Sequence, residues 1–180
     1  MDTLSAVALG ILQGITEFLP VSSSGHLVIG QHLLGWREPH MFFDVCLHVG
    51  TFVAVALVFR RDIALLVRGG LKWLRHPLSG NPYERDEARR IFTLVLCGTI
   101  PTVIIGFAFK DLFERLFASV TAVGFSLLVT GTLLWLTRRK SFSWGMGPFD
   151  MCFRHALLVG LAQGLAITPG ISRSGTTIAV

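Results

Sequence analysis

Charged residues are scarce in this 180-residue sequence: they make up 15% of it, whereas hydrophobic residues make up 52%. Soluble chains carry about 25% charged residues, so this balance excludes an ordinary soluble domain. The mean hydropathy of +0.63 favours a membrane protein instead. Low charge and only seven prolines also exclude a disordered or collagenous chain.

Cysteine is equally rare, with three residues at Cys46, Cys97 and Cys152. All three lie in apolar runs, their number is odd, and none forms a CxxC pair. This pattern excludes a disulfide-stapled domain and indicates packing residues, not a redox or zinc site.

The net charge of +5 is gathered in two groups. Eight basic and four acidic residues lie between Arg60 and Arg90, and the second group is Arg138, Arg139, Lys140 and Arg154. Both flank long apolar runs, as cytoplasmic loops of membrane proteins do. No basic stripe alternates with aromatic residues on a polar segment, so we expect no nucleic-acid partner. Asp2 stands where a secretory signal would be basic, which argues against a signal peptide.

Long apolar runs predict the membrane spans, since about 20 such residues cross the hydrocarbon. Three runs qualify: Met41–Phe59, Ile91–Phe109 and Leu116–Thr137. With the basic loops inside, the first runs inward, the second outward and the third inward. Pro101 should kink the second span, where Gly98 and Gly106 allow close neighbours.

Two loops connect these spans. Arg60–Arg90, which includes Ser79, should be cytoplasmic, with the amphipathic part Ile63–Leu74 at the interface. The charge-balanced Lys110–Arg115 should lie outside.

Two further apolar stretches are broken by turn residues. Leu4–Leu19 is followed by a Pro/Ser/Gly turn at 20–25 and by Leu27–Leu34; His155–Ser172 overlaps a similar break at 169–175. A 16-residue helix reaches only about 24 Å. Broken backbone at membrane depth is tolerated where it is buried in protein or lines a wet cavity, so we predict two re-entrant hairpins.

The two breaks are related by a shift of 150 residues. Six of sixteen ungapped positions are identical: Gly10, Gln13, Gly14, Ser22, Ser24 and Gly25 match Gly160, Gln163, Gly164, Ser172, Ser174 and Gly175. Residue frequencies near 7% predict about one such match. Because the breaks enter from opposite sides, they indicate an inverted repeat with a binding site near the midplane.

The predicted fold is therefore an all-α polytopic membrane protein with inverted repeats and two re-entrant broken-helix hairpins. We expect one integral membrane domain over residues 1–180. Its first repeat covers about 1–140, and its second begins near 150 and is incomplete.

Glu17 is the only charged residue from Thr3 to Trp36. An ionisable group in an apolar segment costs a few kcal/mol, which makes it a candidate functional residue. Gln13 lies one helical turn earlier, so both side chains could give oxygen ligands to Mg²⁺ or Ca²⁺. The alternative is an interfacial glutamate capped by the serine run.

His26 follows Ser22, Ser23, Ser24 and Gly25 at the tip of the first break. Its position allows it to act as acid, base or nucleophile near neutral pH.

Arg173 is the only charged residue between His155 and Val180. Its guanidinium suits phosphate oxygens, and a salt bridge to Glu17 is the alternative. The expected substrate-binding residues are the hydroxyl side chains and glycines of both turns: Ser22, Ser24, Gly25, Gly170, Ser172, Ser174, Thr176 and Thr177.

Asp44 and His48 share a helix face, and interfacial packing is the interpretation we favour for them.

The two motifs resemble those of the undecaprenyl-diphosphate phosphatase family of bacterial inner membranes. Gln13 to Glu17 is similar to its (E/Q)xxxE motif and precedes a Ser-rich turn, and Pro169 to Thr177 is similar to its PGxSRSxxT motif. The resemblance covers the whole chain. Position 13 is glutamine, the less acidic family option. The family is longer, and this chain ends in an apolar run at Val180, so the resemblance implies missing later spans.

The resemblance implies dephosphorylation of undecaprenyl diphosphate, which recycles the lipid carrier for cell-wall synthesis and is associated with bacitracin resistance. It implies a multi-pass inner-membrane protein whose active site faces the periplasm, with the diphosphate lipid and membrane lipids as partners. The expected catalytic residues are Glu17, His26, Arg173 and Ser23. Either His26 or Ser23 could be the nucleophile, and a homodimer remains an option.

Three rival classes share some of these features. A lipid transporter would also show inverted repeats and broken helices. An intramembrane serine protease usually takes its serine and histidine from separate elements, unlike Ser23 and His26. Type-2 phosphatidic acid phosphatases would need a second histidine where this chain has Ala179.

Overall fold

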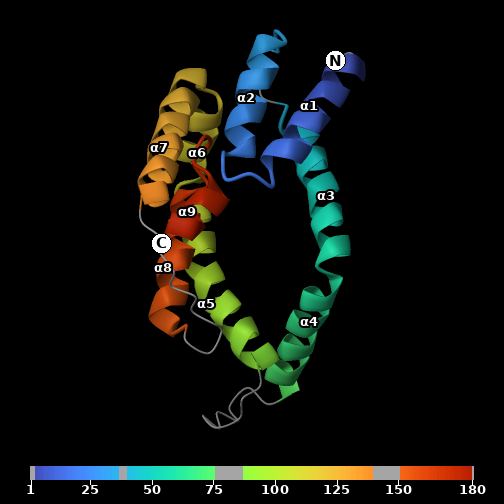
Figure 1. Ribbon diagram of the computed structural model, residues 1–180, viewed down its shortest axis with the longest axis vertical. Coiled ribbons are helices and arrows are strands. Elements are labelled where there is room, and N and C mark those ends of the chain that lie inside the picture. The colour runs from blue at the N-terminus through green and yellow to red at the C-terminus, as the bar shows by residue number, and fades with distance from the viewer. Residues whose placement is uncertain (1–2, 37–39, 76–86, 140–150, 180) are drawn as a thin grey trace.

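The protein folds into helices throughout the part that the structure describes. The computed structural model describes residues 3–36, 40–75, 87–139 and 151–179, and these contain nine helices and no strand (Figure 1). The helices are α1 (Thr3–Thr16), α2 (Ser23–Leu33), α3 (Met41–Val58), α4 (Arg60–Arg75), α5 (Glu87–Ala108), α6 (Lys110–Phe117), α7 (Val120–Arg139), α8 (Phe153–Leu165) and α9 (Arg173–Ala179). The predicted all-α class is therefore confirmed.

The three predicted spans correspond to α3, α5 and α7. By length and composition, α5 over Ala88–Ala108 and α7 over Val120–Thr137 can each cross a membrane. The α3 helix bends by 86° into α4 at Phe59 and can form a third span only as part of that pair. Large apolar side chains on all three are exposed, such as Phe52 and Phe107 at 67% and 79%. Since these faces are apolar, they suit contact with lipid.

The segment predicted to be a short outer loop is a helix. Residues 110–117 form α6, whose Phe113 is buried, and Lys110 pairs with Glu114 at 3.6 Å. The following span begins at Val120 and not at Leu116, because Ser119 starts it: the Ser119 Oγ accepts a hydrogen bond from the Ala122 N–H at 3.3 Å. An apolar pattern alone could not separate these two helices.

The amphipathic segment predicted at the interface is α4, which packs against the start of α5. Gly69 permits this contact, because a Cβ there would lie 2.1 Å from the Ala88 carbonyl oxygen. Residues 76–86 of the predicted cytoplasmic loop, including Ser79, lie outside the described residues, as do the expected repeat boundaries near 140 and 150. The last residues of that loop, 87–90, begin α5.

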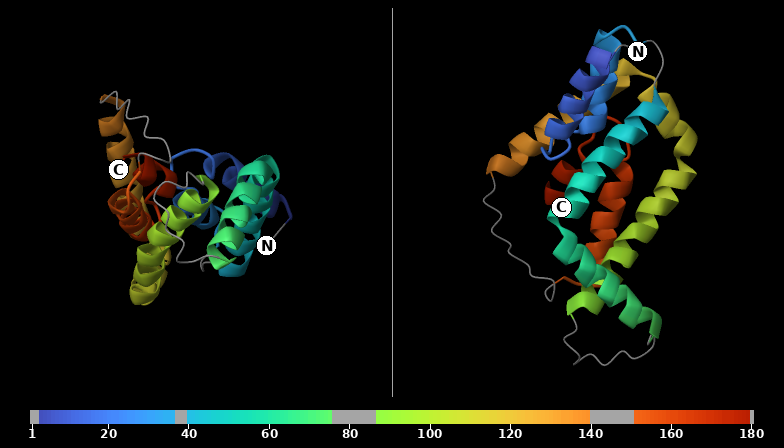
Figure 2. Two further views of the ribbon diagram at one scale, coloured as in Figure 1. Left: turned by 90° about the horizontal axis from the view of Figure 1, so that it is seen from below. Right: turned by 90° about the vertical axis from the view of Figure 1, so that its right-hand side faces the viewer.

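Close backbone packing joins α5 to α8. A Cβ on Gly160 would lie 2.1 Å from the Gly98 carbonyl oxygen, and the Thr102 hydroxyl donates to the Gly160 carbonyl at 2.8 Å. Small residues that allow such contact are typical of packed membrane helices, as predicted for Gly98. The α7 helix leans away from α5 (Figure 2) and packs on α2, α6 and α9.

The two predicted breaks form hairpins that enter from opposite ends of the molecule. The turn between α1 and α2 points down in Figure 1, the turn between α8 and α9 points up, and the turns meet. Their contact is reciprocal: a Cβ on Gly25 would lie 2.8 Å from the Gly170 Cα, and one on Gly175 would lie 3.2 Å from the Pro20 carbonyl oxygen. Position 170 is position 20 shifted by 150 residues, and position 175 is position 25 shifted by the same amount. The two contacts are therefore equivalent, and the turns are related by an approximate twofold axis.

The helix boundaries of the first hairpin differ from the prediction. The α1 helix ends at Thr16, three residues before the expected end, and α2 begins at Ser23, four residues early. Pro20 disfavours a helical conformation for Leu19, and the Val21 N–H closes a tight turn on the Leu19 carbonyl at 2.8 Å. The serine run therefore forms the first turn of α2 as well as the loop.

Cys152 provides a test of the membrane orientation. It is exposed at the start of α8 beside Arg154, and a hydrogen bond from the His155 backbone lowers the pKa of its thiol. More thiolate is therefore present at neutral pH, and we expect a membrane-impermeant maleimide to label Cys152 from the cytoplasmic side only. An Asp111→Cys variant on α6 should react only from the outside. Labelling of both from one side would contradict the predicted topology.

Candidate functional site

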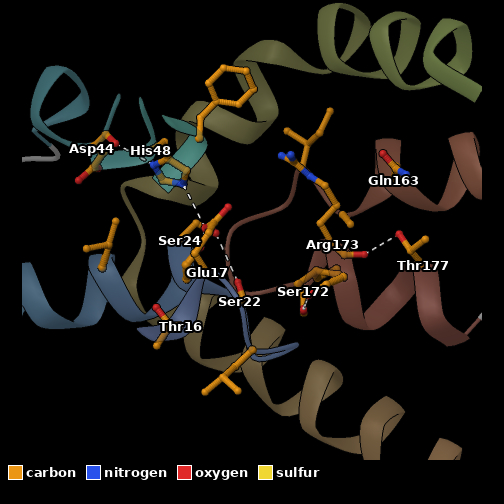
Figure 3. Close-up of a pocket in the computed structure, with 18 of the residues that line it drawn as sticks. Thr16, Glu17, Ser22, Ser24, Asp44, His48, Gln163, Ser172, Arg173 and Thr177 are labelled. Carbon is orange, nitrogen blue, oxygen red and sulfur yellow. Dashed lines mark hydrogen bonds and ion pairs between the residues drawn. The ribbon is translucent and has the colours of Figure 1, made fainter. Parts of the chain in front are cut away.

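A cavity of about 930 Å³ lies where the two turns meet, bounded on one side by α3 (Figure 3). Its polar wall is made by Thr16, Glu17, Ser22, Ser23, Ser24, Asp44, His48, Gln163, Ser172, Arg173, Ser174 and Thr177. Its apolar wall is made by Leu19, Leu27, Val45, Val49, Phe52, Phe117, Ala166, Ile167 and Ile171. The cavity therefore combines a polar centre with an apolar surface large enough for part of a lipid chain.

Glu17 is the centre of the polar contacts. Its Oε2 accepts hydrogen bonds from the Gln13 Nε2 at 2.9 Å and from the Ser23 hydroxyl, and it lies 3.9 Å from the His48 Nε2. A carboxylate that accepts a serine proton in this way can act as the base for that hydroxyl. The carboxylate is thus held by α1, α2 and α3 together.

The two turns hold their serines in the same way. Ser22 Oγ lies 3.3 Å from Ser24 Oγ and accepts from the Gly25 N–H at 3.4 Å; Ser172 Oγ lies 3.2 Å from Ser174 Oγ and accepts from the Gly175 N–H at 3.0 Å. Ser22 is buried at a φ of 66°, a left-handed conformation that serine rarely adopts. Such strain is typical of functional turns.

Thr130 of α7 fixes the second turn. Its buried hydroxyl donates to the Gly170 carbonyl at 2.7 Å and accepts from the Ser172 N–H at 3.0 Å. These contacts set where α9 begins and hence where Arg173 emerges.

Arg173 extends into the cavity from the start of α9. Within the described residues its guanidinium makes no hydrogen bond or ion pair, and Glu17 pairs with His48 instead. The alternative of a structural Glu17–Arg173 salt bridge is thus not the arrangement found. An unpaired guanidinium facing hydroxyl groups suits an anionic ligand.

Several predicted site residues do not line the cavity: Gln13, Gly25, His26, Gly170 and Thr176. Gln13 is buried and acts on the cavity only through Glu17. Gly25 and Gly170 serve the contact between the turns, since side chains there would collide. The Gly25 and Gly175 N–H groups donate to the Ser22 and Ser172 hydroxyl oxygens of their own turns. The Thr176 hydroxyl donates to the Ser172 carbonyl.

His26 is half-buried, and its Nδ1 lies 2.8 Å from the Ser22 carbonyl oxygen. A carbonyl can only accept, so Nδ1 carries the proton in this contact. The ring therefore supports the turn that carries Ser23 and is not itself in the cavity wall.

Three cavity residues with a titratable or amide side chain were assigned no function from the sequence: Asp44, His48 and Gln163. Asp44 and His48 were expected to pack at the interface, but they face the cavity because α3 lies opposite the turns (Figure 3). Gln163 is the repeat partner of Gln13 and extends into the cavity, since Ile167 stands at the position equivalent to Glu17. Two features of the sequence could have identified these residues as part of the site. One is the i,i+4 spacing of Asp44 and His48, and the other is the match of Gln163 to Gln13 in the repeat.

The oxygen atoms suitable for a hard cation are few. Among the described residues no group of three or more His, Cys, Asp or Glu side chains could hold a metal. Glu17 supplies one carboxylate, and Gln13 directs its Nε2 at that carboxylate while its Oε1 is buried without a hydrogen-bond partner. This set fits a cation that takes most of its ligands from water and phosphate, as Mg²⁺ commonly does, and not a closed protein site.

Comparison with known proteins agrees with the two motifs. The chain is 47% identical over 182 residues to the undecaprenyl-diphosphatase of Desulfosudis oleivorans and 48% identical over 180 residues to that of Alkaliphilus metalliredigens. Each alignment covers 99% of this chain but only 66% and 65% of these relatives. The chain thus spans slightly less than two thirds of their length. Residues 6–180 match the family described as bacitracin resistance protein BacA, and the chain belongs to this family.

Proposed function

We propose that the protein hydrolyses undecaprenyl diphosphate to undecaprenyl phosphate and inorganic phosphate. The observation that carries the proposal is the arrangement of one cavity: the Ser23–Glu17 pair, an Arg173 guanidinium with no partner among the described residues, and an apolar wall. The relatives named above are undecaprenyl-diphosphatases, which gives the substrate class. The product would return the lipid carrier to cell-wall synthesis.

The diphosphate binds at the meeting point of the turns, with the prenyl chain along the apolar wall. Arg173 contacts the phosphate oxygens, and the cavity-facing hydroxyls of Ser24, Ser174 and Thr177 add polar contacts. Phosphoryl transfer depends mainly on positioning and on stabilising the charge of the transferred group. The Arg173 guanidinium opposite the serine–carboxylate pair supplies both.

Ser23 is the nucleophile that the geometry favours. Its Oγ attacks the terminal phosphorus while its proton passes to Glu17; the bridging P–O bond breaks, and Glu17 protonates the departing prenyl phosphate. Water then attacks the phosphoserine and gives a proton to Glu17, phosphate leaves, and the proton returns to Ser23. His26 holds the turn through the Ser22 carbonyl, and it is the rival nucleophile or base.

A divalent cation, Mg²⁺ or Ca²⁺, is the cofactor that the family resemblance suggests. Glu17 would hold it, with Gln13 reaching it only if the amide turned to present Oε1. When bound, the cation would neutralise phosphate charge.

The protein is a multi-pass component of the bacterial inner membrane in this proposal, with the cavity open to the periplasm. The basic groups on α4 and around Arg154 then face the cytoplasm. Its partners are the prenyl diphosphate and membrane lipids, and a homodimer is compatible with the exposed apolar faces.

Phosphate release from the C55 diphosphate is the direct test. Purified protein in detergent or nanodiscs should release one phosphate per lipid, and activity should fall when a chelator is added. A lipid that crosses the bilayer without loss of phosphate would instead support the transporter alternative and contradict the proposal.

The covalent intermediate separates the two nucleophiles. We expect quenched turnover with a ³²P-labelled substrate to trap an alkali-labile, acid-stable phosphoserine, which is lost in Ser23→Ala. His26→Ala should lower the rate at least about 100-fold, because the turn that positions Ser23 loses its support. An acid-labile phosphoprotein that survives in Ser23→Ala would assign the nucleophile to His26.

A further inference from the structure

A histidine that the predicted catalytic motifs do not include faces Glu17 across the cavity. His48 lies on α3, and its Nε2 is 3.9 Å from the Glu17 Oε2 (Figure 3). Its Nδ1 is 2.7 Å from the carbonyl oxygen of Asp44, one helical turn earlier. Because a carbonyl only accepts, Nδ1 bears hydrogen in this contact, so Nε2, the nitrogen directed towards Glu17, is the one whose lone pair a metal can take.

This arrangement is the one that histidine ligands of metals show. Such a histidine almost always donates its other ring N–H to a carbonyl or carboxylate, which fixes the tautomer and the ring orientation. Asp44, whose carbonyl holds the His48 ring, is itself held by a hydrogen bond, since the buried Gln31 of α2 donates through its Nε2 to the Asp44 Oδ1 at 2.5 Å. The end of α3 that carries His48 is therefore tied to the hairpin that carries Glu17.

We infer that His48 Nε2 and the Glu17 carboxylate together bind a divalent cation that prefers mixed nitrogen and oxygen ligands, such as Mn²⁺, Co²⁺ or Zn²⁺. Gln13 is a poor second ligand in this geometry, because it directs an N–H group at Glu17. Two ligands of one metal are about 3.0 to 3.5 Å apart, so the pair needs to close by about half an ångström. Water and phosphate oxygens complete the coordination.

The inference changes the expected metal preference. Mg²⁺ and Ca²⁺ prefer oxygen ligands, whereas imidazole suits the transition metals, whose affinities rise from Mn²⁺ to Cu²⁺. The chain should therefore bind Mn²⁺ or Co²⁺ more tightly than Mg²⁺. The role of such an ion in phosphate release rests on the proposed function, but its binding can be measured without substrate.

The test is binding of Mn²⁺ to the purified, metal-free protein, followed by electron paramagnetic resonance. We expect the pulsed spectrum of bound Mn²⁺ to show ¹⁴N coupling from an imidazole. His48→Gln should lose that coupling and weaken Mn²⁺ binding at least about tenfold, because it removes one of two protein ligands. Mg²⁺ binding, measured by competition, should change little. The control is His32→Gln, an exposed histidine of α2 that does not line the cavity.

Two results would overturn the inference, and neither depends on the phosphatase assay. Wild-type protein whose bound Mn²⁺ shows no ¹⁴N coupling would exclude a histidine ligand even if His48→Gln folded poorly. If His48 is only a protonated partner of Glu17, it repels cations, and His48→Gln would bind Mn²⁺ as well as or better than wild type. Loss of activity with intact ¹⁴N coupling would instead concern the proposed function alone.

Discussion

Glu17→Gln is expected to abolish phosphate release from undecaprenyl diphosphate, with a loss of at least about 100-fold in rate. The amide keeps the shape of the side chain but cannot take the proton of Ser23, whose hydroxyl donates to the Glu17 Oε2. It also removes the carboxylate that would hold a cation. The residual rate should therefore be insensitive to a chelator. Phosphate release with and without chelator, measured in wild type and variant, tests both effects.

Gln13→Glu provides the matched comparison one helical turn away. Gln13 is 1% exposed, so a second carboxylate there repels Glu17 unless a cation or a proton lies between them. With a cation shared by both residues, the variant should keep or raise activity. A Glu17→Gln enzyme that folds and retains full activity would remove Glu17 from both of its roles.

Arg173→Ala is expected to lower the rate by about 100-fold or more, the scale of losing one group that stabilises transition-state charge. Arg173→Lys should retain the fold yet lose at least about tenfold, roughly 1.4 kcal/mol, because lysine keeps the charge but lacks the planar fork. The guanidinium has no partner among the described residues, so these losses should come from contacts with substrate. Steady-state rates and thermal unfolding of both variants would separate catalysis from stability.

The double variant Glu17→Gln with Arg173→Ala tests the remaining alternative. If the two charges only neutralised each other, removing both should restore much of the activity. The structure gives Glu17 other partners, Gln13, Ser23 and His48, so we expect the double variant to stay inactive. Rescue would contradict the assignment of Arg173 to phosphate.

Helix positions could be predicted from the sequence wherever a single local pattern, such as an apolar run, covered the segment. The apolar runs at 91–109 and 41–59 became α5 and α3 with ends shifted by few residues. The predictions were wrong where two patterns overlapped. Leu116 and Phe117 are apolar enough to extend α7, but Ser119 caps a new helix and leaves them in α6.

The charged motif residues could be found from the sequence because the free-energy cost of a charge in an apolar segment depends on that segment alone. A lone Glu17 in one apolar stretch and a lone Arg173 in another need no partner to be noticed. The match between the turns also indicated that they would meet, as the contact between Gly25 and Gly170 shows. What each side chain touches could not be read in this way. His26 lies beside the nucleophile candidates in sequence, yet its ring faces the backbone of Ser22.

By itself, the sequence determined that the chain is helical and suited to a membrane, that it contains two related broken hairpins, and which motif residues carry charge and hydroxyl groups. These properties depend on composition, periodicity and repeat, which are local. Only the tertiary structure decided that α3 lies across from the two turns and places His48 against Glu17. It alone also decided that Arg173 faces the cavity and has no partner for its guanidinium within the described part of the chain. The physical reason is that partners such as these come from separate helices, and the packing of those helices sets their distances.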